Sequence, residues 1–206
     1  MDAKDWNSRY DQTDLMWSQG PNQWIEQVTA NLPPGRALDL AAGEGRNAIW
    51  LAGRGWEATA LDFSAVALDR ASRIASERLG DGAARFSTRC EDLFSYSPEL
   101  QAYDLVIVVY LQVADNQRTR VLRAAAEAVA PGGTLVVTAH DPENAIRGHG
   151  GPQDPAVLYS AADVSADIDG AGLTVQRAEL VTRVVTTPDG EREALDCLVV
   201  ATRPRI

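Results

Sequence analysis

Two glycines and an acid stand together in the run from Ala37 to Ala48, A-L-D-L-A-A-G-E-G-R-N-A. Gly43 and Gly45 have no Cβ, so the backbone can turn tightly and let a ligand lie against main-chain N–H groups at the start of the next helix. Asp39, at the end of the preceding apolar run, brings a carboxylate to the same crevice. A carboxylate suits a cationic ligand group better than a phosphate, and the run predicts a nucleotide-type cofactor site.

A second acid, Asp62, ends the next apolar run, residues 57–61. A carboxylate in this position can accept hydrogen bonds from both hydroxyls of a ribose. The spacing from Asp39 to Asp62 fits one strand, a helix and the next parallel strand. Both acids are therefore predicted at the same carboxyl edge of a sheet, which is where open α/β sheets bind ligands.

Length and charge limit the classes of function. A chain of 206 residues can bury a full core between one sheet and two helix layers, but it is short for two domains of ordinary size. Its 29 acidic and 19 basic residues give a net charge of -10, with no Lys/Arg run that could follow a phosphate backbone. We therefore expect one domain, residues 1–206, that does not bind nucleic acid.

The start of the chain is polar and no stretch approaches 18 uninterrupted apolar residues, so we predict a cytoplasmic protein that does not bind membranes. Cys90 and Cys197 are too few and too isolated for a disulfide framework or a metal knuckle. No metal site is predicted, and Cys197 is interpreted as strand packing.

Strand and helix patterns alternate along most of the chain. The run Y-D-L-V-I-V-V-Y is nearly all apolar, which is typical of a strand buried on both faces at the centre of a parallel sheet. Pro131-Gly132-Gly133 is expected to end the helix before it. The elements predicted after Asp62 are a helix at 65–79, strands at 83–88 and 103–110, a helix at 116–129, a strand at 134–139 and a short helix at 161–170.

Two later segments break this alternation. Residues 141–155 are rich in Pro and Gly and are interpreted as a long substrate-side loop. Residues 173–186 and 191–202 are strand-like, and the connection 187–190 is too short for anything but an antiparallel hairpin. The predicted fold class is α/β, a doubly wound, mostly parallel sheet with a C-terminal antiparallel hairpin.

These features together resemble the Rossmann-like fold of S-adenosylmethionine-dependent methyltransferases, which has a seven-stranded sheet. The resemblance covers nearly the whole chain and rests on D-L-A-A-G-E-G-R-N, Asp62, Asp92, the turn at 130–133 and the hairpin. The G-x-G-R-N form followed by W-L-A-G-R-G-W, the start Trp-x-x-Arg-Tyr and a Pro-Asn pair at 21–22 are most similar to tellurite-resistance and thiopurine-type small-molecule methyltransferases. The family usually has Gly where this chain has Ala41.

The resemblance implies a role for each matching residue. The methionine amino end of the cofactor would be held by Asp39 and the main chain from Ala41 through Gly43 to Gly45. Asp62 would bind the ribose, Phe63 a face of the adenine, and Asp92 with the Leu93 backbone the adenine edge. Tyr110 and Leu111 would border the methyl group and the acceptor. Two further implied cofactor contacts are Asn47 and Glu91. Residues 1–34 would form an N-terminal helical lid that contains Trp6, Arg9, Tyr10 and Trp17. Of these, Arg9 and Trp17 would contact the cofactor, and Arg9 is the candidate partner for its carboxylate.

Both histidines of the chain fall where an acceptor would enter. His140 follows the strand at 134–139, and His149 lies within Gly148-His149-Gly150-Gly151. An imidazole can take a proton near neutral pH, so His140 is a candidate general base. Tyr110 is the second candidate catalytic residue. For His149 an anchoring role in the loop is preferred. An acceptor that ionises unaided would need no base, and then His140 would only shape the pocket.

Each assignment has a structural alternative. Strand-end acids such as Asp39 and Asp62 can cap the following helix, and Asp92 can be a solvated loop carboxylate. Arg9 can be a surface charge. One apolar helix face can be formed by the aromatic residues Trp6, Tyr10, Trp17 and Trp24.

The predicted function is transfer of a methyl group from S-adenosylmethionine to a small-molecule acceptor by in-line displacement, by a monomer or a homodimer. Two alternatives remain open. Gly43-x-Gly45-x-x-Ala48 also fits an NAD(P)-dependent oxidoreductase, although Asp39 and the terminal hairpin disfavour it. The other is an S-adenosylmethionine-binding sensor without catalysis.

Overall fold

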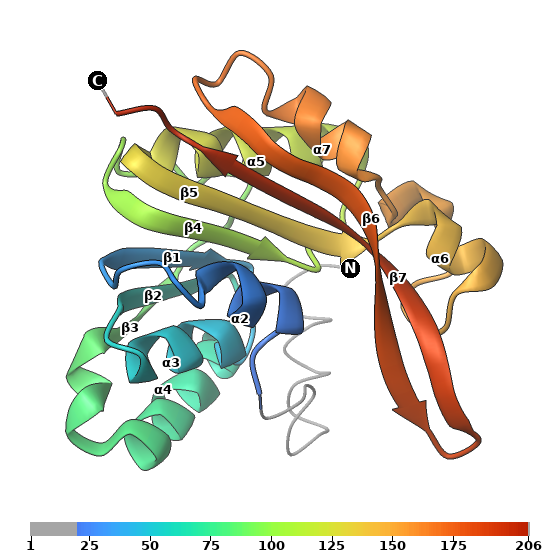
Figure 1. Cartoon of the computed structure of the whole chain (residues 1–206). Helices are drawn as coiled ribbons and strands as arrows, with labels where there is room; N and C mark the ends of the chain where they lie inside the picture. The colour runs from blue at the N-terminus through green and yellow to red at the C-terminus, as the bar shows by residue number, and fades with distance from the viewer. Residues whose placement is uncertain (1–19, 206) are drawn as a thin grey trace.

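The computed structural model describes residues 20–205, and these contain one seven-stranded sheet with the strand order β3-β2-β1-β4-β5-β7-β6 (Figure 1). All neighbouring strands are parallel except the pairs that involve β7, which are antiparallel. The strands are β1 (Arg36–Leu40), β2 (Glu57–Asp62), β3 (Phe86–Cys90), β4 (Tyr103–Val109), β5 (Val129–His140), β6 (Thr174–Thr187) and β7 (Gly190–Thr202). The predicted fold class is confirmed: this is the Rossmann-like methyltransferase fold.

Helices cover both faces of the sheet. Figure 1 shows α2, α3 and α4 on one face and α5 and α7 on the other, while α6 lies beside β7. The helices are α2 (Gln23–Thr29), α3 (Arg46–Gly53), α4 (Ala65–Leu79), α5 (Asp115–Ala128), α6 (Pro142–Arg147) and α7 (Ala161–Asp167), with 3₁₀ turns η1 (Gly80–Arg85) and η2 (Pro155–Val157). None of the helices within residues 20–205 is long and apolar enough to cross a membrane.

Local sequence explains where the helices begin and which side they bury. The α4 helix begins after Ser64, whose side chain accepts a hydrogen bond from the N–H of Ala67. Its buried residues, Ala67, Leu68, Ala71 and Ala75, recur at helical spacing and form one apolar face. The α7 helix begins with a reciprocal capping box between Ser160 and Asp163.

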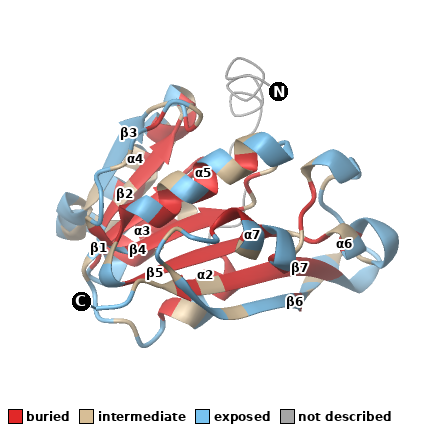
Figure 2. Ribbon diagram, turned by 90° about the horizontal axis from the view of Figure 1, so that it is seen from above, coloured by how far each residue is buried: buried red, intermediate tan, exposed pale blue. Residues whose placement is uncertain are grey.

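The central strand β4 supplies both halves of the core, as its continuous apolar sequence predicts. Val106 and Val108 pack into the cluster under α5 and α7. Leu105 and Ile107 point to the opposite face and pack with α2, α3 and α4. Figure 2 shows these inner strands buried, whereas β6 at the sheet edge is largely exposed.

The strand predicted at 83–88 is displaced. Residues 80–85 form η1, and β3 runs from Phe86 to Cys90. Gly80, with φ +52°, ends α4 and leads into this extra turn. Because β3 is an edge strand whose residues are mostly exposed, it lacks the apolar signal that would fix its position in the sequence.

Two further predictions differ in detail. Pro131-Gly132-Gly133 does follow a helix, but it lies inside β5 as an irregularity where the pairing with β4 shifts between Tyr103 and Leu105. The predicted loop 141–155 contains the short helix α6, which Asp141 caps by accepting from the N–H of Glu143.

The C-terminal hairpin extends beyond the sheet. Pro188 and Asp189 form its two-residue turn, and β6 pairs with β7 over almost its whole length. The pairing of β5 with β7 ends at His140 and Asp196, so the part of the hairpin nearer the turn projects as a free arm (Figure 1). The last residues of β5 thus meet the base of this arm.

Candidate functional site

The glycine turn connects β1 to α3 at the carboxyl edge of the sheet. Its backbone has positive φ at Ala41 (60°), Gly43 (55°) and Gly45 (73°). A Cβ on Gly45 would lie 3.1 Å from Cβ of Ala71, so glycine here also permits close packing of α3 against α4. Glycine suits left-handed backbone, whereas Ala41 adopts it at an energetic cost.

Asp39 lies near the end of β1, just before this turn, and its side chain is buried, with 1% exposure. Its Oδ2 accepts a hydrogen bond of 3.3 Å from the N–H of Ala48, in the first turn of α3. Its Oδ1 is buried and has no hydrogen-bond partner among residues 20–205. Burial raises the pKa of Asp39 to about 7, against the opposing effects of the Ala48 N–H and the charge of Arg46. One oxygen of this buried acid therefore lacks a donor among the described residues.

Asp62 lies at the end of β2 and connects the glycine turn to the start of α4. Its Oδ2 accepts from the N–H of Gly43 at 2.8 Å and its Oδ1 accepts from the N–H of Ser64 at 2.9 Å. Burial raises its pKa, although these N–H groups oppose the shift. Neither strand-end acid is the helix N-cap, because Gly45 precedes α3 and Ser64 caps α4.

The residues predicted on the adenine side follow β2 and β3. Phe63 is half-buried, Asp92 is exposed and Leu93 is buried in the core. Glu91 forms an ion pair with Arg89, and its main-chain N–H donates to the carbonyl of Asp62. The structure thus places the loop after β3 beside the end of β2.

Other predicted cofactor residues are less close to the turn or are not described. Asn47 is buried, and its Oδ1 accepts from the N–H of Asn22, so this side chain holds the approach to α2. Arg9 and Trp17, like Trp6 and Tyr10, lie outside the described residues. Trp24 packs in the core of the α2 side.

A polar cluster stands at the carboxyl ends of β4 and β5. The ring of Tyr110 stacks on the ring of His140, with centroids 4.7 Å apart and planes 26° from parallel. Nδ1 of His140 lies 3.3 Å from Oδ1 of Asp196, an ion-pair distance. The two predicted catalytic residues are therefore brought together, and each contacts the same carboxylate on β7.

Asp196 was not predicted from the sequence, yet it is the centre of this cluster. It is 0% exposed, and its Oδ2 receives three hydrogen bonds from other elements. The donors are Trp24 Nε1 at 3.1 Å, the Tyr110 hydroxyl at 2.9 Å and Arg183 Nε at 3.0 Å. The signal was an aspartate inside the apolar run A-L-D-C-L-V-V, since a buried acid needs partners.

The charges of the cluster fix its protonation. Burial alone would raise the pKa of Asp196, but contacts with His140, Arg183 and Trp24 outweigh burial and bring the pKa below its ordinary value. Burial and the Asp196 charge raise the pKa of Tyr110, so its hydroxyl remains protonated and donates. Burial and the like charge of Arg183 lower the pKa of Arg46, the first residue of α3. Arg46 thus interacts electrostatically with Asp39 beside the glycine turn and with Tyr110 and Arg183 of the cluster.

The segment after α6 lies over His140. Asn144 is buried and holds this segment, since its Nδ2 donates to the carbonyl of Gly150 and its Oδ1 accepts from the N–H of Leu195. A Cβ on Gly151 would lie 2.8 Å from Nε2 of His140. His149 is exposed.

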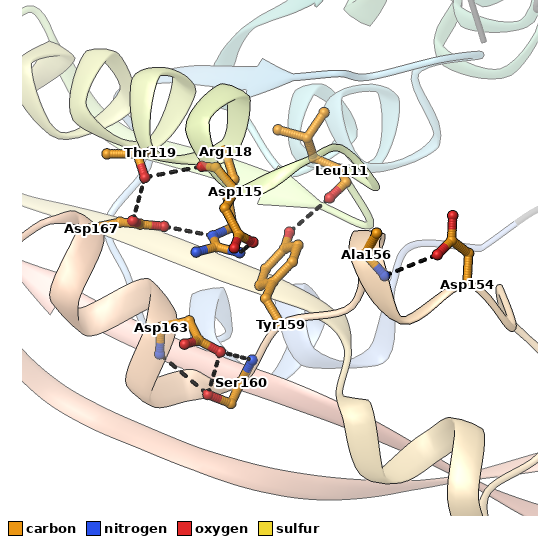
Figure 3. Close-up of polar contacts among 10 residues, drawn as sticks. All are labelled: Leu111, Asp115, Arg118, Thr119, Asp154, Ala156, Tyr159, Ser160, Asp163 and Asp167. Atoms are coloured by element: carbon orange, nitrogen blue, oxygen red, sulfur yellow. Dashed lines mark hydrogen bonds and ion pairs between the residues drawn. The ribbon is translucent and has the colours of Figure 1, made fainter.

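A second buried network fixes the chain just beyond Tyr110 (Figure 3). Tyr159, fully buried, donates from its hydroxyl to the carbonyl of Leu111 at 2.9 Å. Arg118 lies over the Tyr159 ring and pairs with Asp167 at 2.6 Å. These contacts anchor the exit of β4 to α5 and α7.

A shallow cavity of about 170 Å³ lies at the other edge of the sheet, near the amino ends of β1 and β4. It is lined by Pro34, Asp104, Pro131 and Arg205 among others. The strand-end acids and the His140 cluster are at the opposite edge, so this cavity is not part of the candidate site.

Residues 37–133 match the family model described as a methyltransferase domain. This segment contains the glycine turn, Asp62, Asp92 and Tyr110. No curated protein matches the chain.

Solved structures share the fold at low sequence identity. One, described by the conversion of a disulfide bond into a thioacetal group during echinomycin biosynthesis, is 20% identical with TM-score 0.75 and covers 98% of this chain and 92% of its own. The glycopeptide N-methyltransferase MtfA, complexed with S-adenosyl-L-methionine, is 19% identical with TM-score 0.66, covering 92% and 96%. The [4+2]-cyclase SpnF is 18% identical with TM-score 0.66, covering 89% and 81%.

Because one of these structures is a cyclase, the shared fold alone does not define the reaction. The chain has the Rossmann-like methyltransferase fold, and its residues 37–133 match the methyltransferase domain family.

Proposed function

We propose that this protein transfers a methyl group from S-adenosylmethionine to a small-molecule acceptor. The observation that carries the proposal is the buried Oδ1 of Asp39, which has no hydrogen-bond partner among residues 20–205. A ligand ammonium beside the glycine turn would supply the missing donor and would favour the ionised carboxylate.

The other residues at this edge fit the rest of the cofactor. Asp62 retains acceptor capacity for ribose hydroxyls because each carboxylate oxygen has more than one lone pair. Phe63 and the loop Glu91-Asp92-Leu93 stand beside it for the adenine. The methyltransferase domain match over residues 37–133 and the similarity to MtfA, which holds S-adenosylmethionine, support this assignment.

When bound, S-adenosylmethionine supplies an activated methyl group on a sulfonium. The chain then has to align the acceptor with that group and exclude water. Tyr110 and His140, at the ends of adjacent strands β4 and β5, border the acceptor position in this proposal. The segment Gly148 to Gly151 covers His140 and would close the acceptor side.

Several finer assignments remain predictions. They are the tellurite-resistance or thiopurine type, the single domain, the N-terminal lid in residues 1–34, the substrate-side role of residues 141–155, the absence of nucleic-acid binding, the monomer or homodimer state and the cytoplasmic location.

The oxidoreductase alternative is disfavoured by the topology. Dinucleotide-binding sheets of the usual order 3-2-1-4-5-6 have six parallel strands, whereas this sheet ends with the antiparallel strand β7 placed between β5 and β6. A cofactor-binding sensor would have the same cofactor pocket and is distinguished only by turnover.

Calorimetric titration with S-adenosylmethionine, S-adenosylhomocysteine and NADH tests the proposal. We expect binding of both adenosyl ligands and loss of that binding in Asp62→Ala. The matched control is Asp69→Ala, an exposed aspartate on α4, which should bind as the unchanged protein does. Binding of NADH alone would overturn the proposal.

Turnover separates the enzyme from the sensor. Radiolabelled methyl transfer to a panel of small acceptors should be measured with the unchanged protein and with His140→Asn. A methylated product that falls in the variant supports the proposal, whereas tight cofactor binding without any transfer across the panel supports the sensor.

A further inference from the structure

The two oxygens of Asp196 have different partners. Oδ2 receives the hydrogen bonds from Trp24, Tyr110 and Arg183. Oδ1 lies 3.3 Å from Nδ1 of His140, which is an ion-pair distance. Both atoms are buried, and neither makes a hydrogen bond with residues 20–205. A carboxylate oxygen can only accept, so the proton of a neutral His140 belongs on Nδ1. Nε2 then carries the lone pair.

The imidazole is also fixed in orientation. Tyr110 stacks on one side of the ring and itself donates to Asp196, so both residues are held by one carboxylate. Gly151 packs beside Nε2, and a Cβ on this residue would lie 2.8 Å from that atom. The charged groups around the ring are Asp196 on β7, Arg183 on β6 and, through Tyr110, Arg46 on α3.

We infer that Asp196 is a positioning residue that holds His140 as a general base, and that the acceptor atom is the oxygen of a hydroxyl group. This inference rests on the proposed function. In the step, the acceptor O–H bond breaks and its proton moves to Nε2 of His140. The oxygen forms a bond to the methyl carbon as the carbon–sulfur bond breaks, and that bond's electron pair stays on sulfur.

The chemistry of the acceptor follows from the need for a base. A thiol has a pKa near 8.5 and ionises unaided, whereas a phenolic hydroxyl has a pKa near 10 and an alcohol a higher one. An oriented imidazole with a buried carboxylate behind it is useful only for the acceptor that does not ionise unaided. Tyr110 cannot serve as this base, because its raised pKa and its hydrogen bond to Asp196 keep it protonated.

The substitution Asp196→Asn tests this inference because the neighbouring donors determine the orientation of the new side-chain amide. Three donors point at the Oδ2 position, so the amide oxygen must take that place and the NH₂ must face His140. The NH₂ can only donate, which forces Nδ1 of His140 to accept and moves the imidazole proton to Nε2. The variant thus replaces the productive tautomer with the wrong one.

The tautomer can be read by ¹⁵N NMR of histidine-labelled protein. The chain has two histidines, and His149→Gln assigns their signals. We expect Nδ1–H for His140 in the unchanged protein and Nε2–H in Asp196→Asn. The matched control is Asp167→Asn, which alters a buried ion-paired aspartate on the other face of the sheet and should leave the His140 tautomer on Nδ1. An Nε2–H tautomer in the unchanged protein overturns the inference without any variant.

Activity gives the substrate class. Methyl transfer to 4-nitrophenol and catechol should be compared with transfer to 4-nitrothiophenol. We expect O-methylation, with kcat about 10²- to 10⁴-fold lower in Asp196→Asn while the affinity for S-adenosylmethionine stays unchanged. Methylation of the thiol alone, or O-methylation that Asp196→Asn leaves intact, overturns the inference. Failure of the unchanged protein to bind S-adenosylmethionine is a separate result and would instead overturn the proposed function.

Discussion

The main-chain N–H of Gly43 donates a hydrogen bond of 2.8 Å to Oδ2 of Asp62, a residue on the neighbouring strand. One buried carboxylate thereby fixes both the glycine turn and, through Ser64, the start of α4. The shape of the glycine turn thus depends on a hydrogen bond to the neighbouring strand.

Asp62→Asn should therefore lower stability as well as cofactor affinity. An amide has one acceptor, so one of the two N–H groups would face an NH₂ and lose its partner. We expect a loss of about 1–3 kcal/mol in the free energy of unfolding, measured by urea denaturation without ligand. Asp69→Asn, at an exposed position of α4, should change it little. Equal stability of the two variants would contradict this role for Asp62.

Asp39 should make stability depend on pH. Its pKa is raised to about 7 in the folded protein, so between about pH 4 and pH 7 the folded state holds a proton that the unfolded state has lost. The contribution of Asp39 to the free energy of unfolding is then full below about pH 4 and falls as pH rises to about 7. Urea denaturation across this range should show a smaller decline in Asp39→Asn than in the unchanged protein. Parallel curves would contradict the assignment.

Ala41 should gain from replacement by glycine. It adopts φ +60°, which costs an L-residue about 1–2 kcal/mol, while glycine adds about 0.4–1 kcal/mol of unfolded-state entropy. We expect Ala41→Gly to be neutral or to stabilise by up to about 1 kcal/mol. The neighbour Ala42 lacks the positive φ, so Ala42→Gly should destabilise. Thermal denaturation of both variants measures the change in stability. A larger loss of stability in Ala41→Gly than in Ala42→Gly would refute the strain argument.

Gly151→Ala should reduce methyl transfer by covering His140. The new Cβ would lie 2.7 Å from Cδ2 and 2.8 Å from Nε2 of that ring. Gly150→Ala is a matched control, because Gly150 has nearly the same φ (+73° against +74°) but open space around the added atom. Both variants should bind S-adenosylmethionine, and only Gly151→Ala should lose most of its turnover. Equal turnover would indicate that His140 is not next to the acceptor.

The sequence predicted where the residues of the proposed cofactor half lie in the fold, because that half follows one strand–turn–helix unit. Gly43, Gly45, Asp39 and Asp62 are fixed by the geometry of adjacent parallel strands, which recurs whenever this sheet forms. Their positions in the structure agree with the prediction. Segments with a weak apolar pattern were less predictable, as the displacement of β3 to Phe86–Cys90 illustrates.

The acceptor half could not be predicted in the same way. Asp196 meets His140 through the register of β5 with β7, and meets Trp24 across 172 residues of sequence. No local pattern encodes such pairings. The sequence did show an acid, Asp196, within an apolar strand. This pattern predicts a buried carboxylate that needs partners, but it does not say which residues they are.

The contact between Trp24 and Asp196 also sets the order in which the site is completed. During synthesis, the glycine turn and the strands β1 and β2 can assemble long before residue 196 leaves the ribosome, whereas the His140 cluster cannot. A chain that lacks the hairpin would retain the carboxylates of the cofactor half and lose the carboxylate behind His140. The His140 cluster is therefore the last part of the candidate site that the growing chain can complete.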